Sequence, residues 1–162
     1  MRATALTLLL GLTLVSGCSK APIDTAPPLP DGVALAARVG GILTTDEVLA
    51  ILTARFGHPS LLIVDARTNA EWASEHIPGA ANITYDMGNP AADRMFENAM
   101  RHIPRSTNVI IYSNSGTRSA AARSALGLGL PLADASDVEF TAAWDMADGL
   151  DVWKARGYPT IK

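Results

Sequence analysis

The chain has 162 residues, of which 48% are hydrophobic, and its formal net charge is −3 at pH 7. This length fits one small domain with short appendages. A net negative charge gives no electrostatic support for binding DNA or RNA, so we expect no nucleic-acid partner.

Residues 1–17 have the pattern of an export signal. They begin with a Met-Arg pair, continue with an apolar run too short to span a bilayer, and end with Ser16 and Gly17 directly before Cys18. This ending resembles the lipobox of bacterial lipoproteins, in which the signal is cut before the cysteine and that cysteine is acylated. We therefore predict a signal peptide over residues 1–17 and lipidation of Cys18.

The predicted anchor places the protein on the periplasmic side of the cell envelope, held to a membrane through Cys18. In Gram-negative lipoproteins an aspartate at the next position favours the inner membrane, so Ser19 favours the outer one. Cys18 is the only cysteine, so no free thiol remains in the mature protein. Residues 18–37 are rich in proline and alanine and are predicted to form an extended tether.

The folded domain is predicted over residues 38–162, and helical spacing of apolar residues indicates two of its helices. The first opens at residues 44–47. Its predicted apolar face consists of Val48, Leu49, Leu52 and Phe56. The second runs from Asp93 to His102. Its predicted inward residues are Met95, Phe96, Ala99 and Ile103. A later helix, before Gly157, is expected to be capped by Asp148.

Two short apolar runs predict buried parallel strands. Residues 61–64 form the first, which delivers Asp65 and Arg67 at its carboxyl end, and residues 109–112 form the second. The path of residues 131–144 stays open. Alternating strands and helices imply a single α/β domain, with an open parallel sheet and helices on both faces.

The loop after the second strand is the candidate functional site. It consists of Ser113, Asn114, Ser115, Gly116, Thr117, Arg118 and Ser119, and a helix over residues 120–126 follows it. Backbone N–H groups at the start of a helix favour an anion, and the planar guanidinium of Arg118 suits the oxygens of a sulfate or phosphate group. The alternative is an ordinary surface turn with one solvated arginine.

This loop resembles the active-site loop of rhodanese-type sulfurtransferases, in which a strand is followed by C-x-x-G-x-R-S. Gly116, Arg118 and Ser119 match position for position, whereas Ser113 takes the place of the nucleophilic cysteine. The D-x-R motif at residues 65–67, followed by H-I-P-G-A-A-N-I, also resembles the family, as does the segment before the C-terminus, where Asp148 replaces a usual glycine. The resemblance covers roughly residues 41–162 and implies a rhodanese-like fold.

In the rhodanese family the cysteine accepts a sulfane sulfur from thiosulfate and passes it to cyanide or another thiol. An N–H cradle and an arginine can bring a thiol of pKa about 8.5 below neutrality. A serine hydroxyl stays protonated in the same field, and oxygen cannot carry a persulfide. We therefore expect an inactive homologue of thiosulfate sulfurtransferase that binds an oxyanion of the thiosulfate, sulfate or phosphate class, or a protein partner.

Alternative functions remain open at this stage. If Ser113 were an engineered replacement of a cysteine, the native protein would be an active sulfurtransferase. If the loop binds nothing small, the domain is an interaction module of the envelope. A serine hydrolase would need an adjacent base, for which the candidates are His58, His76 and His102.

Asp65 and Arg67 are expected to support the loop from the neighbouring strand end. Arg67 either adds positive field to the anion site or forms a structural ion pair. No cofactor and no metal are expected.

Overall fold

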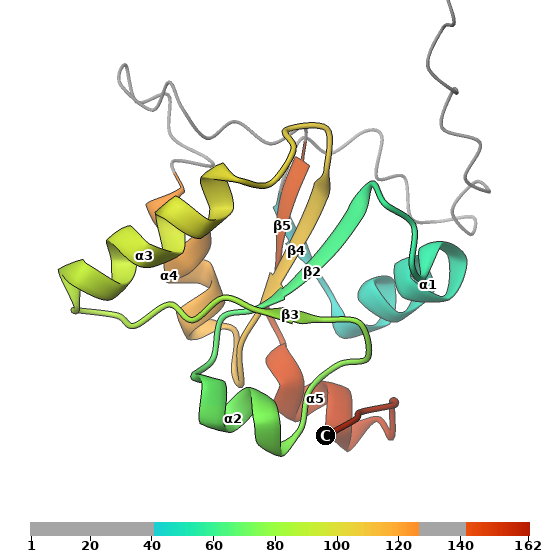
Figure 1. Ribbon diagram of the computed structural model, residues 1–162. Helices are drawn as coiled ribbons and strands as arrows, with labels where there is room; N and C mark the ends of the chain where they lie inside the picture. Colours follow the sequence, from blue (N-terminus) through green and yellow to red (C-terminus); the bar gives the residue numbers. More distant parts are fainter. Residues whose placement is uncertain (1–40, 127–141) are drawn as a thin grey trace, which may run out of the picture.

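The computed structural model describes residues 41–126 and 142–162, which form one sheet with helices on both of its faces (Figure 1). The strands are β1 (Gly41–Leu43), β2 (Leu61–Asp65), β3 (Ala81–Asn82), β4 (Asn108–Tyr112) and β5 (Ala142–Met146). The helices are α1 (Thr45–Arg55), α2 (Asn69–Ser74), α3 (Pro90–Arg101), α4 (Thr117–Ala125) and α5 (Gly149–Ala155). All strands are parallel, in the order β1-β5-β4-β2-β3. The predicted α/β fold is confirmed.

The central strands are apolar on both faces, which is why helices cover both sides of the sheet. Ile110 of β4 and Trp144 of β5 belong to the core shared with α1 and α5. Their neighbours along the strands, Ile111 and Ala143, belong to the second core, shared with α3 and α4. The strand pair β4 and β5 therefore packs against both layers of helices.

Helix α1 begins with a capping box, in which Thr44 and Glu47 satisfy each other's backbone N–H groups. Val48 and Leu52 are buried as predicted. The placement of Phe56 on the same face was wrong, because its side chain is 65% exposed. The helix ends at Arg55 and Phe56 has ψ 127°, so helical spacing no longer applies to this residue.

Helix α3 starts at Pro90, three residues earlier than predicted, because the side chain of Asn89 caps it. Phe96 is buried as predicted, and Ile103 packs at the edge of the same core. The inward placement of Met95 and Ala99 was wrong, since both are exposed. The buried face instead follows i, i+4 and i+7 spacing from Phe96. Its central member is Met100.

Helix α4 also starts earlier than predicted, at Thr117 rather than Ala120, so the last three residues of the candidate loop form its first turn. Gly116, with φ 83°, makes the change of direction from strand to helix. Strand β5 occupies the end of the segment whose path was left open. The remainder of that segment, residues 131–141, lies outside the described residues.

Asp148 has a different role from the one predicted. Its side chain makes no capping bond to α5. It accepts hydrogen bonds from the backbone N–H and the hydroxyl of Thr45, at 3.1 and 3.2 Å, and thereby caps the first turn of α1. The prediction was wrong because α1 reaches this position from a distant part of the chain.

Residues 1–40 lie outside the described part of the chain, so the signal peptide, the lipidation of Cys18 and the tether stay predictions. Within residues 41–126 and 142–162, no helix combines the length and the apolar character needed to cross a bilayer.

Replacing Asp148 with alanine is expected to lower the free energy of unfolding by about 1–2 kcal/mol, the usual effect of losing a helix cap and its favourable dipole interaction. Urea denaturation measures this change. Asp151→Ala is the matched control, because Asp151 is an exposed acid of the same region. The control should lose less than about 1 kcal/mol, because Asp151 contributes only the dipole interaction of an exposed acid in the first turn of α5. Equal losses in both variants would contradict the assigned role of Asp148.

Candidate functional site

The candidate loop lies at the carboxyl end of β4, between the end of that strand and α4. Ser113 is 2% exposed and Ser119 is completely buried. The backbone N–H of Ser119 donates to the hydroxyl oxygen of Ser113 at 3.3 Å, and the two hydroxyl oxygens are also 3.3 Å apart. The hydroxyl of Ser119 donates to the carbonyl of Gly116 at 2.9 Å. Ser113 therefore forms the buried floor of the loop.

The loop is joined to α5 through its backbone. The carbonyls of Ser113 and Asn114 accept hydrogen bonds from the N–H groups of Leu150 and Asp151, at 2.8 and 3.0 Å. In a trans peptide the C=O and the following N–H point in opposite directions. The N–H groups that follow these two carbonyls therefore point away from α5.

Five consecutive backbone N–H groups of the loop have no acceptor among the described residues. They belong to Asn114, Ser115, Gly116, Thr117 and Arg118. The last two lie in the first turn of α4, where N–H groups lack intrahelical partners. Their summed dipoles favour a negative group next to the loop.

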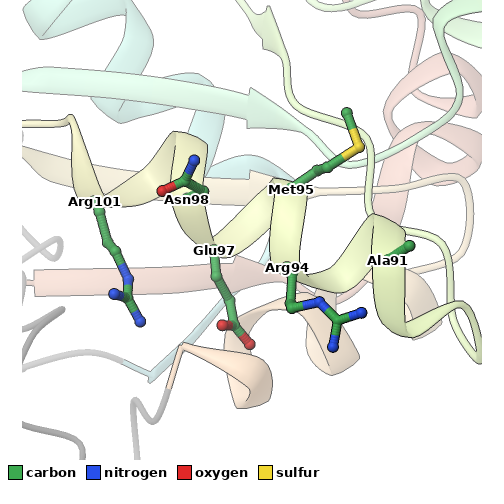
Figure 2. A pocket seen from close by; sticks show the side chains of 6 residues that line it. All are labelled: Ala91, Arg94, Met95, Glu97, Asn98 and Arg101. Atoms are coloured by element: carbon green, nitrogen blue, oxygen red, sulfur yellow. The ribbon is translucent and has the colours of Figure 1, made fainter.

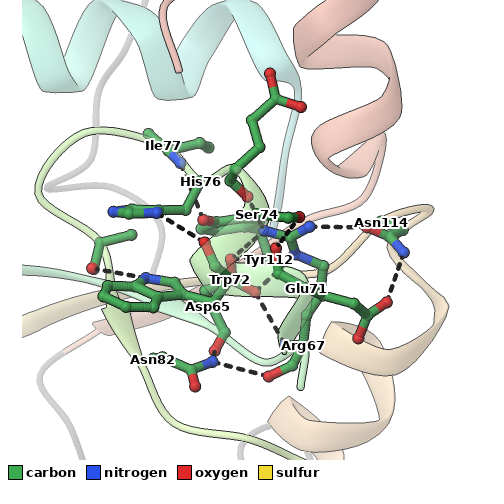
Figure 3. Close-up of polar contacts among 12 residues, drawn as sticks. Asp65, Arg67, Glu71, Trp72, Ser74, His76, Ile77, Asn82, Tyr112 and Asn114 are labelled. Atoms are coloured by element: carbon green, nitrogen blue, oxygen red, sulfur yellow. Dashed lines mark hydrogen bonds and ion pairs between the residues drawn. The ribbon is translucent and has the colours of Figure 1, made fainter. Parts of the chain in front are cut away.

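Asp65 and Arg67 support the loop from the end of β2 (Figure 3). Their side chains are buried and form an ion pair of 2.6 Å. Burial opposes the charge of Arg67, but pairing with Asp65 raises the pKa of its guanidinium. Arg67 also donates to the side chain of Asn114, at 3.2 Å, and to the carbonyl of Glu75. Of the two alternatives for Arg67, the structure shows the ion pair, and Arg67 contacts the loop through Asn114.

Glu71 was not predicted as a site residue from the sequence. The structure brings it to the loop from α2. Its carboxylate accepts from the side-chain amide of Asn114 at 3.0 Å (Figure 3). It also accepts from Arg118 at 2.9 Å. Partial burial opposes ionisation, but the hydrogen bonds from Arg118 and Thr68 lower the pKa of Glu71 to about 2. Glu71 is therefore charged at neutral pH. The capping-box spacing from Thr68 was the only local signal for it.

Asp145 of β5 is a second acid that the sequence analysis did not single out as a site residue. It is 3% exposed, and its Oδ1 has no hydrogen-bond partner among the residues that the structure describes. Burial raises the pKa of Asp145, although a hydrogen bond with Ser119 and the charge of Arg123 act in the other direction.

None of the three histidines is hydrogen-bonded to Ser113. The Nδ1 atoms of His58, His76 and His102 contact the Ser60 hydroxyl, the Trp72 carbonyl and the Asn98 carbonyl. Among the described residues, the hydroxyl of Ser113 bonds only to Ser119. The arrangement therefore lacks the adjacent base that a serine nucleophile needs. In the same part of the chain, no group of three metal-ligating side chains gathers.

A shallow hollow follows the outer side of α3 and shares no residue with the candidate loop (Figure 2). It is lined by Ala91, Arg94, Met95, Glu97, Asn98 and Arg101. All of these except Glu97 are exposed. The hollow therefore lacks the buried, convergent polar groups that are typical of a ligand site.

The chain belongs to the rhodanese-like domain family. The family model for this domain matches residues 48–156, which is more than half of the sequence. The resemblance inferred from the loop, the D-x-R motif and the C-terminal segment is thereby confirmed. None of the curated proteins matches the chain.

Solved structures with the same fold come from distant organisms. A rhodanese-related protein from Thermoplasma volcanium aligns with a TM-score of 0.51 and 18% identity, over 74% of this chain and 96% of that one. The rhodanese-like domain from an Anabaena protein aligns with a TM-score of 0.54 and 20% identity, over 74% of this chain and 77% of that one. A rhodanese-like domain protein from Staphylococcus aureus aligns with a TM-score of 0.50 and 24% identity, over 70% of this chain and 90% of that one. At these identities the likeness shows the fold alone.

Replacing Gly149 with alanine is expected to be strongly destabilising, because a Cβ there lies 2.1 Å from the Asn114 carbonyl oxygen and φ is +68°. Gly157 provides the control, since its φ is +72° but nothing lies within 4 Å of an added Cβ. Gly157→Ala should cost about 1 kcal/mol from backbone strain alone, and Gly149→Ala at least about 2 kcal/mol more. Urea denaturation of both variants measures the difference. Similar costs would show that the loop can move away from α5 easily.

Proposed function

We propose that this protein is a lipid-anchored protein of the cell envelope whose rhodanese-like domain does not transfer sulfur. Its loop, Ser113–Ser119, instead holds a small oxyanion or an acidic group of a partner. The observation that carries this proposal is the row of five N–H groups that find no acceptor in the described part of the chain, next to a neutral hydroxyl at Ser113.

The absence of a thiol argues against sulfur transfer. Cys18 is the only cysteine of the chain and lies in the predicted lipidation motif. At the position of the family's nucleophile, the hydroxyl of Ser113 is buried and hydrogen-bonded to Ser119, with no histidine base bonded to it. A hydroxyl in that environment stays protonated at neutral pH, and its oxygen cannot become a persulfide.

Anion binding is supported by the helix start and by Arg118. The N–H groups of Thr117 and Arg118 open α4, where the helix dipole favours negative charge. The Arg118 side chain is 30% exposed, so its remaining donors can be reached from solvent. Thiosulfate, sulfate and phosphate share the tetrahedral oxygens that such a site accepts.

The envelope location rests on the N-terminal pattern that ends at Cys18. The proposed tether of residues 18–37 would let the domain meet small anions or protein partners away from the membrane surface.

The full-length chain is expected to form no thiocyanate from thiosulfate and cyanide above the level of Ser113→Ala. Ser113→Cys restores the nucleophile in the cradle, so this variant should gain measurable activity. A colorimetric thiocyanate assay compares the three proteins. Turnover by the native chain as fast as by Ser113→Cys would falsify the proposed loss of sulfur transfer.

The full-length chain in detergent is expected to bind sulfate or thiosulfate, as measured by isothermal titration calorimetry. Arg118→Ala should weaken binding at least about tenfold, because it removes a charge-assisted contact. Arg156→Ala is the matched control, since Arg156 is an exposed arginine paired with Asp46, away from the loop. Undetectable binding to any oxyanion, or equal weakening by both variants, would contradict the site and favour a module that binds only a protein.

A further inference from the structure

The loop already holds a carboxylate, and that carboxylate belongs to the chain itself. Arg118 contacts one oxygen of Glu71, Oε2, at 2.9 Å. The side-chain amide of Asn114 donates to the other oxygen, Oε1, at 3.0 Å. Two side chains of the candidate loop thus bind both oxygens of an internal anion.

Glu71 is held in this position by its own helix. It is the third residue of α2, and the backbone N–H and hydroxyl of Thr68 donate to its Oε2 at 2.9 and 2.7 Å. The same oxygen accepts from Arg118. The carboxylate is therefore fixed by the helix cap and lies ready beside the guanidinium, without the cost of ordering a free side chain.

The two arginines of the site are both compensated. Arg67 is paired with Asp65, and Arg118 is paired with Glu71. An external anion in the loop would meet the negative charge of Glu71 at close range, and it gains the full charge of Arg118 only if the contact with Glu71 loosens.

We propose that Glu71 is an internal competitor that limits the affinity of the loop Ser113–Ser119 for anions. This inference rests on the proposed function. An incoming oxyanion exchanges with the Glu71 carboxylate at Arg118, so the affinity of the site is set by how firmly α2 keeps Glu71 in place.

The other acids near the site do not play this part. Asp65 is buried against Arg67. The carboxylate of Glu75 bonds to Lys154 and to the Thr160 hydroxyl. Among the described residues, Glu71 is the acid that bonds to the side chains of both Asn114 and Arg118.

Sulfate titration of the full-length chain by calorimetry tests the inference, with Glu71→Gln as the central variant. Glutamine keeps the capping-box geometry and removes the charge. Sulfate should bind about tenfold more tightly to Glu71→Gln at low ionic strength, and the gain should shrink as salt screens the charges. Glu75→Gln removes the same charge without changing a loop contact, so it should alter affinity less than about twofold.

A double-variant cycle tests whether the gain in sulfate affinity of Glu71→Gln depends on Arg118. If Glu71 acts by competing for Arg118, Glu71→Gln should give little gain in an Arg118→Gln background. Thermal unfolding of each variant is recorded in parallel, which separates a loss of binding caused by loosening of α2 from an effect on the site itself.

The outcomes separate this inference from the proposed function. Tighter binding by Glu71→Gln that depends on Arg118 supports the inference. If the native chain binds sulfate and a stably folded Glu71→Gln binds it equally or more weakly, the competitor role of Glu71 is overturned. The proposed anion site is not affected by that result. Binding only after Glu71→Gln supports the competitor role and overturns anion binding by the native chain. No binding by any variant overturns both.

Discussion

The geometry of the site depends on one backbone contact, between the loop after β4 and the start of α5. The carbonyls of Ser113 and Asn114 satisfy the first N–H groups of α5. This same contact turns the next N–H groups of the loop in the opposite direction and leaves them open. Glycines at 116 and 149 make the approach possible, because a Cβ at either position would lie within 2.1 Å of a carbonyl oxygen.

The sequence predicted the layers of the fold well, because those signals are local. Continuous apolar runs identified β2 and β4, and strands buried on both faces imply helices on both sides. The errors at Phe56, Met95 and Asp148 share a different cause. They depend on where a helix ends, on its rotation against the core, and on which helix lies next to it. Those properties arise from packing between distant segments.

The loop itself was predictable because one short segment carries its motif. The electrostatic partners of the loop could not be predicted from the sequence. Glu71 is 47 residues from Arg118 and 43 from Asn114, and the spacing Thr68-x-x-Glu71 indicates only a helix cap. Asp145 reaches Ser119 from β5, whose path could not be predicted. A local motif thus identifies the residues of the candidate loop, whereas the charge balance around them requires the fold.

In the proposed role, the serine at position 113 does more than remove a nucleophile, because it also changes the charge at the floor of the loop. A thiolate at the floor of the loop would add a negative charge, and that charge would compete with any bound anion for the N–H groups. The neutral hydroxyl of Ser113 adds no such charge. Arg67 and Arg118 are each paired to an acid. Within residues 41–126 and 142–162, the N–H groups of the loop are left as its uncompensated positive feature. In the proposed role, the substitution therefore converts a site built to activate sulfur into one whose remaining chemistry is reversible binding, with Glu71 as the group that an anion must displace.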